Sequence, residues 1–117
     1  MEQIEQLYHN DFGVAFYWIR NDKVLREKVQ LVFKETGFYL SFSELMRFSA
    51  NIETTCINIK CSDCKLREHC HKFLLETPFP GLELAVSESE AIQLKDLVSG
   101  TLFQVELDNY LNNLCKN

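Results

Sequence analysis

Apolar and aromatic residues in the first part of the chain come in short runs that are separated by turn-prone residues. Residues 5–19 hold two such runs on either side of the sequence NDFG, and a second ND pair at 21–22 marks another turn. Residues 29–40 hold two further runs around the sequence ETG, in which a glycine is available for a positive φ. This pattern is typical of consecutive β-hairpins, so we expect the first half of the chain to be mostly sheet.

Two later stretches carry the pattern S-x-x-E, which is typical of a helix N-terminus. In this pattern the serine hydroxyl and the glutamate carboxylate each accept a hydrogen bond from a backbone amide that would otherwise lack a partner. Ser41 with Glu44 predicts a helix that runs to about residue 50, and Ser87 with Glu90 predicts a second one. Gly100 stands where a residue just past a helix end belongs, and a third start pattern follows it, so we expect a separate last helix.

The last predicted helix has a wide apolar face, because apolar residues recur along it with helical spacing. We expect this face to pack on the sheet or on the same helix of a second copy, and the second arrangement would give a symmetric homodimer. The residues of this face are Phe103, Leu107, Tyr110, Leu111 and Leu114.

The middle of the chain is rich in cysteine and is flanked by two predicted strands, at residues 54–60 and 71–75. The segments before and after it match when Ser41 is aligned with Ser87, which indicates a duplicated hairpin-helix unit or two unrelated segments of the same type. These patterns predict the α+β class, with an antiparallel sheet of hairpins, two or three packed helices and a cysteine-rich loop. We expect one domain over residues 1–117, composed of a first half at 1–53, the strand and loop at 54–72, and a second half at 73–117.

Composition narrows the classes of protein to which the chain can belong. Its 117 residues, of which 46% are hydrophobic and 25% charged, are typical of one globular domain. The net charge of −5 opposes binding to nucleic acid, and no apolar stretch reaches the roughly 18 residues of a membrane span. The N-terminal sequence MEQIEQLYHND has no basic lead and no apolar run, unlike a secretory signal. We therefore expect a cytoplasmic protein that binds neither nucleic acid nor membrane.

The cysteines are the strongest candidates in the sequence for a metal-binding site. Three of them follow the pattern C-x2-C-x5-C, and a C-x2-C step lets two thiolates turn onto one metal ion. A tetrahedral zinc site needs a fourth ligand, which an upstream cysteine or a histidine beside the last cysteine can supply. The candidate ligands are Cys56, Cys61, Cys64, Cys70 and His71, with His69 as a further choice for the fourth.

The C-x2-C-x5-C segment, with basic residues between its last two cysteines, resembles the iron-sulfur segment of RecB-type nucleases and of radical-enzyme accessory domains. The resemblance covers about ten residues and implies a cluster, whereas the acidic and lysine residues that cleave nucleic acid in those nucleases have no counterpart here. Residues 29–48 and 73–98 resemble a family of small bacterial proteins of unknown function, which implies a structural or regulatory module. Three states of the cysteines remain open: a zinc-stapled loop, an iron-sulfur cluster, and reduced thiols without metal.

The common signatures of phosphate-binding loops, serine hydrolases, dinucleotide-binding proteins and zinc proteases do not occur in the sequence. We therefore expect a non-enzymatic interaction or regulatory module that binds a protein partner or a second copy of itself, with no catalytic residues to name. An iron-sulfur redox or sensor protein is the first alternative, and a small thiol-dependent enzyme is the second.

Overall fold

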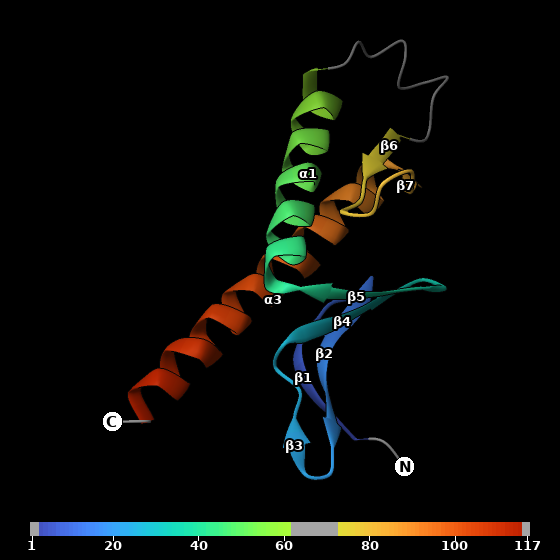
Figure 1. The fold of residues 1–117 in the computed structure, drawn as a ribbon. Coiled ribbons are helices and arrows are strands. Elements are labelled where there is room, and N and C mark those ends of the chain that lie inside the picture. Colours follow the sequence, from blue (N-terminus) through green and yellow to red (C-terminus); the bar gives the residue numbers. More distant parts are fainter. Residues whose placement is uncertain (1–2, 62–72, 116–117) are drawn as a thin grey trace.

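The computed structural model describes residues 3–61 and 73–115. They form a five-stranded antiparallel sheet, a separate two-stranded antiparallel sheet and two long helices (Figure 1), so the predicted α+β class is confirmed. In chain order the elements are β1 (Gln3–His9), β2 (Gly13–Arg20), β3 (Lys23–Val24), β4 (Lys28–Phe33), β5 (Thr36–Ser41), α1 (Phe42–Cys61), β6 (Phe73–Glu76), β7 (Glu83–Val86) and α3 (Glu88–Cys115).

The larger sheet has the order β1-β2-β4-β5, and the short β3 pairs with β2. The turn predicted at residues 21–22 is confirmed, since Asn21 and Asp22 have φ values of 51° and 62° and join the paired residues Arg20 and Lys23. Two positive φ values in a two-residue loop are typical of a type I′ turn, whose twist matches that of the paired strands. The local sequence therefore determines this end of the sheet.

The turn between β4 and β5 differs from the prediction. The residue with a positive φ is Lys34, at 52°, whereas Gly37 lies inside β5 opposite Val32. Phe33 pairs with Thr36, so a two-residue loop closes the hairpin one step before the glycine is reached. Lys34 also forms an ion pair with Glu90 at the start of α3, and this tertiary contact helps to hold the turn in place.

Both predicted capping boxes are present. At the start of α1, the Glu44 amide donates to Ser41 Oγ at 3.3 Å, and the Ser41 amide donates to Glu44 Oε1 at 2.9 Å. At the start of α3, the corresponding distances between Ser87 and Glu90 are 3.1 Å and 2.9 Å. Each box satisfies two backbone amides within four residues of sequence, which explains why both starts could be recognised without the fold.

The predicted strand at residues 54–60 is wrong, because α1 continues as one helix of 20 residues to Cys61. The β-branched residues there favour a strand locally, but the spacing of Ile52, Cys56 and Ile59 places all three on one helical face. All three are buried, and α1 packs against both α3 and β6. Burial of this face outweighs the local preference, so the helix does not end near residue 50.

The predicted helix end at Gly100 is also wrong, since α3 passes through it without a break. The ring of Tyr8 in β1 lies against this position, and a Cβ on Gly100 would stand 2.5 Å from Tyr8 Cζ. Thr101, predicted to begin the last helix, donates from Oγ1 to the Leu97 carbonyl at 2.6 Å, a bond made inside a helix. Gly100 therefore provides space for close packing and does not terminate the helix.

Helices α1 and α3 cross and pack against each other (Figure 1), and both contribute buried residues to the core. Each follows a hairpin and a capping box, and equivalent positions counted from the two capping serines are buried in both, which supports the duplicated unit. The equivalent buried residues are Leu45 with Ala91, Phe48 with Leu94, Ile52 with Val98, and Ile59 with Val105.

The first capping box should make stability depend on pH. The hydrogen bond from the Ser41 amide is the main reason why the pKa of Glu44 lies below its ordinary value of 4.5. A pKa that is lower in the folded state stabilises the fold above pH 4.5, and this contribution is lost as the pH falls through the folded value. We expect the advantage of the wild type over Glu44→Gln in thermal unfolding to shrink between about pH 5 and about pH 3.

In this comparison, glutamine keeps an oxygen that can complete the capping box but carries no charge. Glu53→Gln is the matched control, because Glu53 is exposed on the same helix and lies outside the cap. An advantage over Glu44→Gln that stays constant across the acidic range would contradict the prediction.

Candidate functional site

The first candidate ligand, Cys56, lies in the core and not at the surface. Its side chain is 7% exposed, and its thiol points at α3, with Sγ 3.9 Å from the carbonyl oxygen of Ala91. Cys61 ends α1 five positions later, and five residues correspond to a rotation of about 140° around a helix axis. A metal bound by Cys56 would therefore require the packing of α1 on α3 to open.

The remaining candidate ligands, namely the Cys61 side chain and the residues Cys64, Cys70 and His71, lie outside the described residues, as does His69. Within residues 3–59 and 73–114, no group of three or more histidine, cysteine, aspartate or glutamate side chains is placed to hold a metal ion. The two elements that flank the cysteine-rich segment, α1 and β6, pack against each other. The zinc site and the iron-sulfur cluster therefore stay predictions from the sequence.

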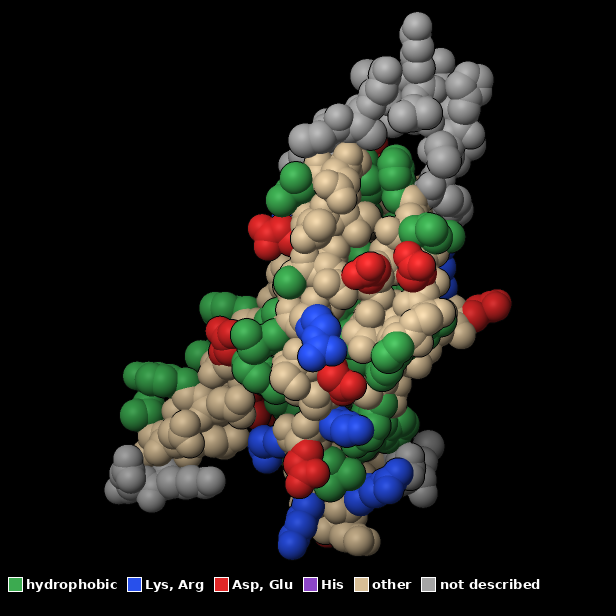
Figure 2. Space-filling model, turned by 45° about the horizontal axis from the view of Figure 1, so that its top comes forward, with side chains coloured by type: hydrophobic (Ala, Val, Ile, Leu, Met, Phe, Trp, Pro, Cys, Tyr) green, Lys and Arg blue, Asp and Glu red, His purple; other side chains and the backbone are tan. Residues whose placement is uncertain are grey.

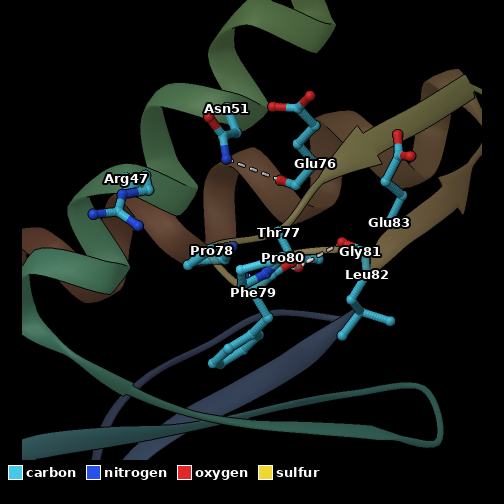
Figure 3. Close-up of a pocket in the computed structure, with 10 residues that line it drawn as sticks. All are labelled: Arg47, Asn51, Glu76, Thr77, Pro78, Phe79, Pro80, Gly81, Leu82 and Glu83. Atoms are coloured by element: carbon cyan, nitrogen blue, oxygen red, sulfur yellow. Dashed lines mark hydrogen bonds between the residues drawn. The ribbon is translucent and has the colours of Figure 1, made fainter.

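A polar groove lies between α1 and the β6-β7 hairpin. It consists of two adjoining hollows of about 340 Å³ and about 420 Å³, which share Asn51, Glu76 and Glu83. Figure 3 shows the first hollow, in which Asn51 Nδ2 donates to the backbone carbonyl of Glu76 at 3.1 Å. The Glu76 and Glu83 carboxylates come from directly paired strand positions. The Asn51 hydrogen bond joins β6 to α1, so the position of Asn51 in this groove is explained by the packing of these two elements.

The described histidine outside the cysteine-rich segment, His9, has a local role. Its Nδ1 is hydrogen-bonded to Gln6 Nε2 at 2.7 Å, on the same strand. The sequence places Asp11 beside it, but His9 is exposed near the end of β1 and pairs with Val14 across the hairpin. The hydrogen bond of His9 therefore joins two residues of the same strand and does not pair the imidazole with a carboxylate.

Helix α3 exposes more large apolar side chains than any other element of the described chain, and most of them lie in its second half. This half projects beyond the larger sheet (Figure 1), and apolar side chains gather along it (Figure 2). The predicted apolar face of the last helix is exposed there. We call it the α3 stripe; its members and their exposed fractions are Phe103 63%, Leu107 40%, Tyr110 61%, Leu111 49% and Leu114 55%.

The opposite side of the same helix faces the body of the protein. Val105 is 4% exposed and Thr101 is fully buried, and at 100° per residue both lie across the helix from Phe103. This half of α3 is therefore apolar on two sides, and the protein's own sheet uses only one of them. The sequence prediction of an apolar face holds, whereas its packing against the sheet does not.

A small groove separates β1 from the projecting half of α3 and adjoins the α3 stripe. Its volume is about 170 Å³, and Leu107 and Leu111 belong to both the groove and the stripe. Arg26 holds the helix at this point, because its Nε donates to Asp108 Oδ2 at 2.9 Å and its guanidinium lies 3.8 Å from the Glu5 carboxylate. The groove is lined by Glu5, Gln6, Leu7, Gln104, Leu107, Asp108 and Leu111.

Tyr17 packs beneath this charged pair and is fully buried. Its hydroxyl has no hydrogen-bond partner among the described residues. Burial, and secondly the negative charge of Asp108, raise the pKa of this hydroxyl, so Tyr17 stays neutral at physiological pH. No sequence signal distinguishes Tyr17 or Arg26 from the other residues of the sheet, because their importance depends on a contact with a distant helix.

The described helices include none that is long and apolar enough to cross a membrane. Comparison of the chain with protein-family models, with curated proteins and with solved structures finds no match.

Proposed function

We propose that this protein is a non-enzymatic interaction module that binds a protein partner through the α3 stripe. The observation that carries the proposal is the exposure of five large apolar side chains on one face of a projecting helix. Water contact with so much contiguous apolar surface is unfavourable, and such patches commonly mark interaction sites. A partner that covers the stripe would remove this cost.

The composition around the stripe supports a protein partner. Residues 98–115 contain only two charged side chains, Glu106 and Asp108, and Asp108 is already paired with Arg26. Depletion of charge together with exposed Phe and Tyr is typical of the centre of a protein interface. Two aromatic side chains, Phe103 and Tyr110, are more than half exposed and are suited to act as anchors.

Charged substitutions on the α3 stripe should abolish association without unfolding the protein. We expect Phe103→Asp and Tyr110→Asp to reduce partner affinity by at least about tenfold, because each places a carboxylate in an apolar contact. The fold should persist, since neither side chain belongs to the buried core. The measurement is native size-exclusion chromatography of the protein in extracts of its source cells, with thermal unfolding as the check on folding.

Ile92→Asp is the control, because Ile92 is 55% exposed on the same helix and lies outside the α3 stripe. The wild type and Ile92→Asp should elute well above the 13.7 kDa of one chain, and the two stripe variants should elute as monomers. Elution of the wild type as a monomer in extract that contains about 200 μM of the protein would refute the proposal.

A further inference from the structure

We infer that the partner is a second copy of this chain, and that the two α3 stripes pack antiparallel about a two-fold axis. This inference rests on the proposed function and names the partner for the same surface. Its basis is that one face of the molecule carries both a row of protruding apolar side chains and the groove beside it. A two-fold interface needs such a self-complementary patch, since each copy supplies the same residues.

The spacing of the stripe fits a seam between two helices. Phe103, Leu107, Tyr110 and Leu114 are separated by four, three and four residues, which is the spacing of a heptad repeat. An axis between residues 108 and 109 places position 103 opposite 114 of the second copy, and position 107 opposite 110. Each aromatic side chain then meets a leucine, and no apolar residue of the seam lacks a counterpart.

The groove gives this arrangement a defined register. Tyr110 is 61% exposed, and in the antiparallel pairing it lies opposite Leu107, which lines the groove between α3 and β1. An aromatic side chain inserted there would contact Leu107 and Leu111 with its ring. Gln6 and Gln104 at the edge of the groove can exchange hydrogen bonds with its hydroxyl. Each copy would thus supply one tyrosine and one groove.

The pairing of unlike residues and the helix dipoles favour the antiparallel direction over the parallel one. A parallel pairing would set each seam residue against its own copy, so Tyr110 would face Tyr110 and not the groove beside Leu107. Antiparallel helices also place opposite ends of their dipoles together.

The area of the stripe is sufficient for a weak dimer. Its five side chains are 40% to 63% exposed, and each offers roughly 100 Å² for contact. Two copies would therefore bury about 1,000 Å² in total, which is at the lower limit for a specific interface. We expect a dissociation constant in the range of about 1 to 100 μM.

A pair of complementary variants tests both the partner and the direction. Leu107→Lys and Tyr110→Glu should each abolish the dimer, because either change places two charges in the seam. An equimolar mixture should form a heterodimer, since position 107 of one copy faces position 110 of the other and Lys meets Glu. Sedimentation velocity with a fluorescent label on one variant measures the association, and we expect recovery of wild-type affinity to within about tenfold.

Leu107→Lys mixed with Phe103→Glu is the control, because positions 107 and 103 do not face each other in the antiparallel pairing. Recovery in the first mixture alone supports the inference, and recovery in neither or in both overturns it. If the purified wild type is monomeric at 200 μM, about twice the weakest expected dissociation constant, but elutes as a larger species in extract, the inference fails while the proposed function stands. If the wild type is monomeric both when purified and in extract, the inference and the proposed function are both refuted.

Discussion

Replacing Phe48 with alanine is expected to lower the free energy of unfolding by about 3–5 kcal/mol. Phe48 is fully buried in α1, and its ring lies 5.7 Å from that of Phe38 in β5. Phe38 in turn contacts Phe79 in the turn between β6 and β7, with ring centroids 5.6 Å apart. Removal of the Phe48 ring would leave a cavity where α1 and both hairpins meet, so the loss is large.

Phe103→Ala is the matched control, because the same side chain is removed from a site that is 63% exposed. Its effect on the monomer should stay within about 0.5 kcal/mol. Urea unfolding followed by circular dichroism, at a protein concentration well below that of dimer formation, measures both variants. Equal losses for Phe48→Ala and Phe103→Ala would contradict the assignment of Phe48 to the core.

The cysteine-rich segment carries the second large expected effect. If Cys61, Cys64 and Cys70 act together on zinc, protein purified under reducing conditions should hold about one zinc ion per chain, and Cys64→Ser should hold almost none. Cysteine thiols bind zinc only after they lose their proton, so acidification should release the metal from the wild type. Elemental analysis measures the zinc content, and unfolding measurements should show that the hairpin-helix body of Cys64→Ser remains folded.

Cys56→Ser is the control that the structure provides. Because the Cys56 thiol is buried against α3, we expect this variant to keep its zinc, with His71 or His69 as the fourth ligand. Loss of zinc in Cys56→Ser would instead show that α1 opens to complete the site. A brown protein with visible absorption after anaerobic purification would indicate the iron-sulfur alternative, and absence of any metal would leave reduced thiols.

The sequence alone identified the features that depend on neighbouring residues. Both capping boxes were recognisable because their hydrogen bonds join residues three positions apart, as between Ser41 and Glu44. The turn at Asn21 and Asp22 was recognisable because these residue types tolerate a positive φ. The α+β class followed from these helix starts and turns and from the alternation of apolar residues between them. The apolar face of the last helix was likewise visible in its spacing.

Only the tertiary structure decided how far the helices extend and which surfaces they share. The segment at 54–60 has a local preference for strand, but burial of Ile59 and Cys56 in the core makes it helical. Gly100 has the residue type of a helix end, yet the ring of Tyr8 from a distant strand explains its presence within α3. The sequence predicted the apolar face of α3, but only the path of the sheet beneath this helix determines that Val105 is buried while Phe103 remains exposed. Contacts between segments far apart in the chain set these outcomes, and their energies do not appear in any local pattern.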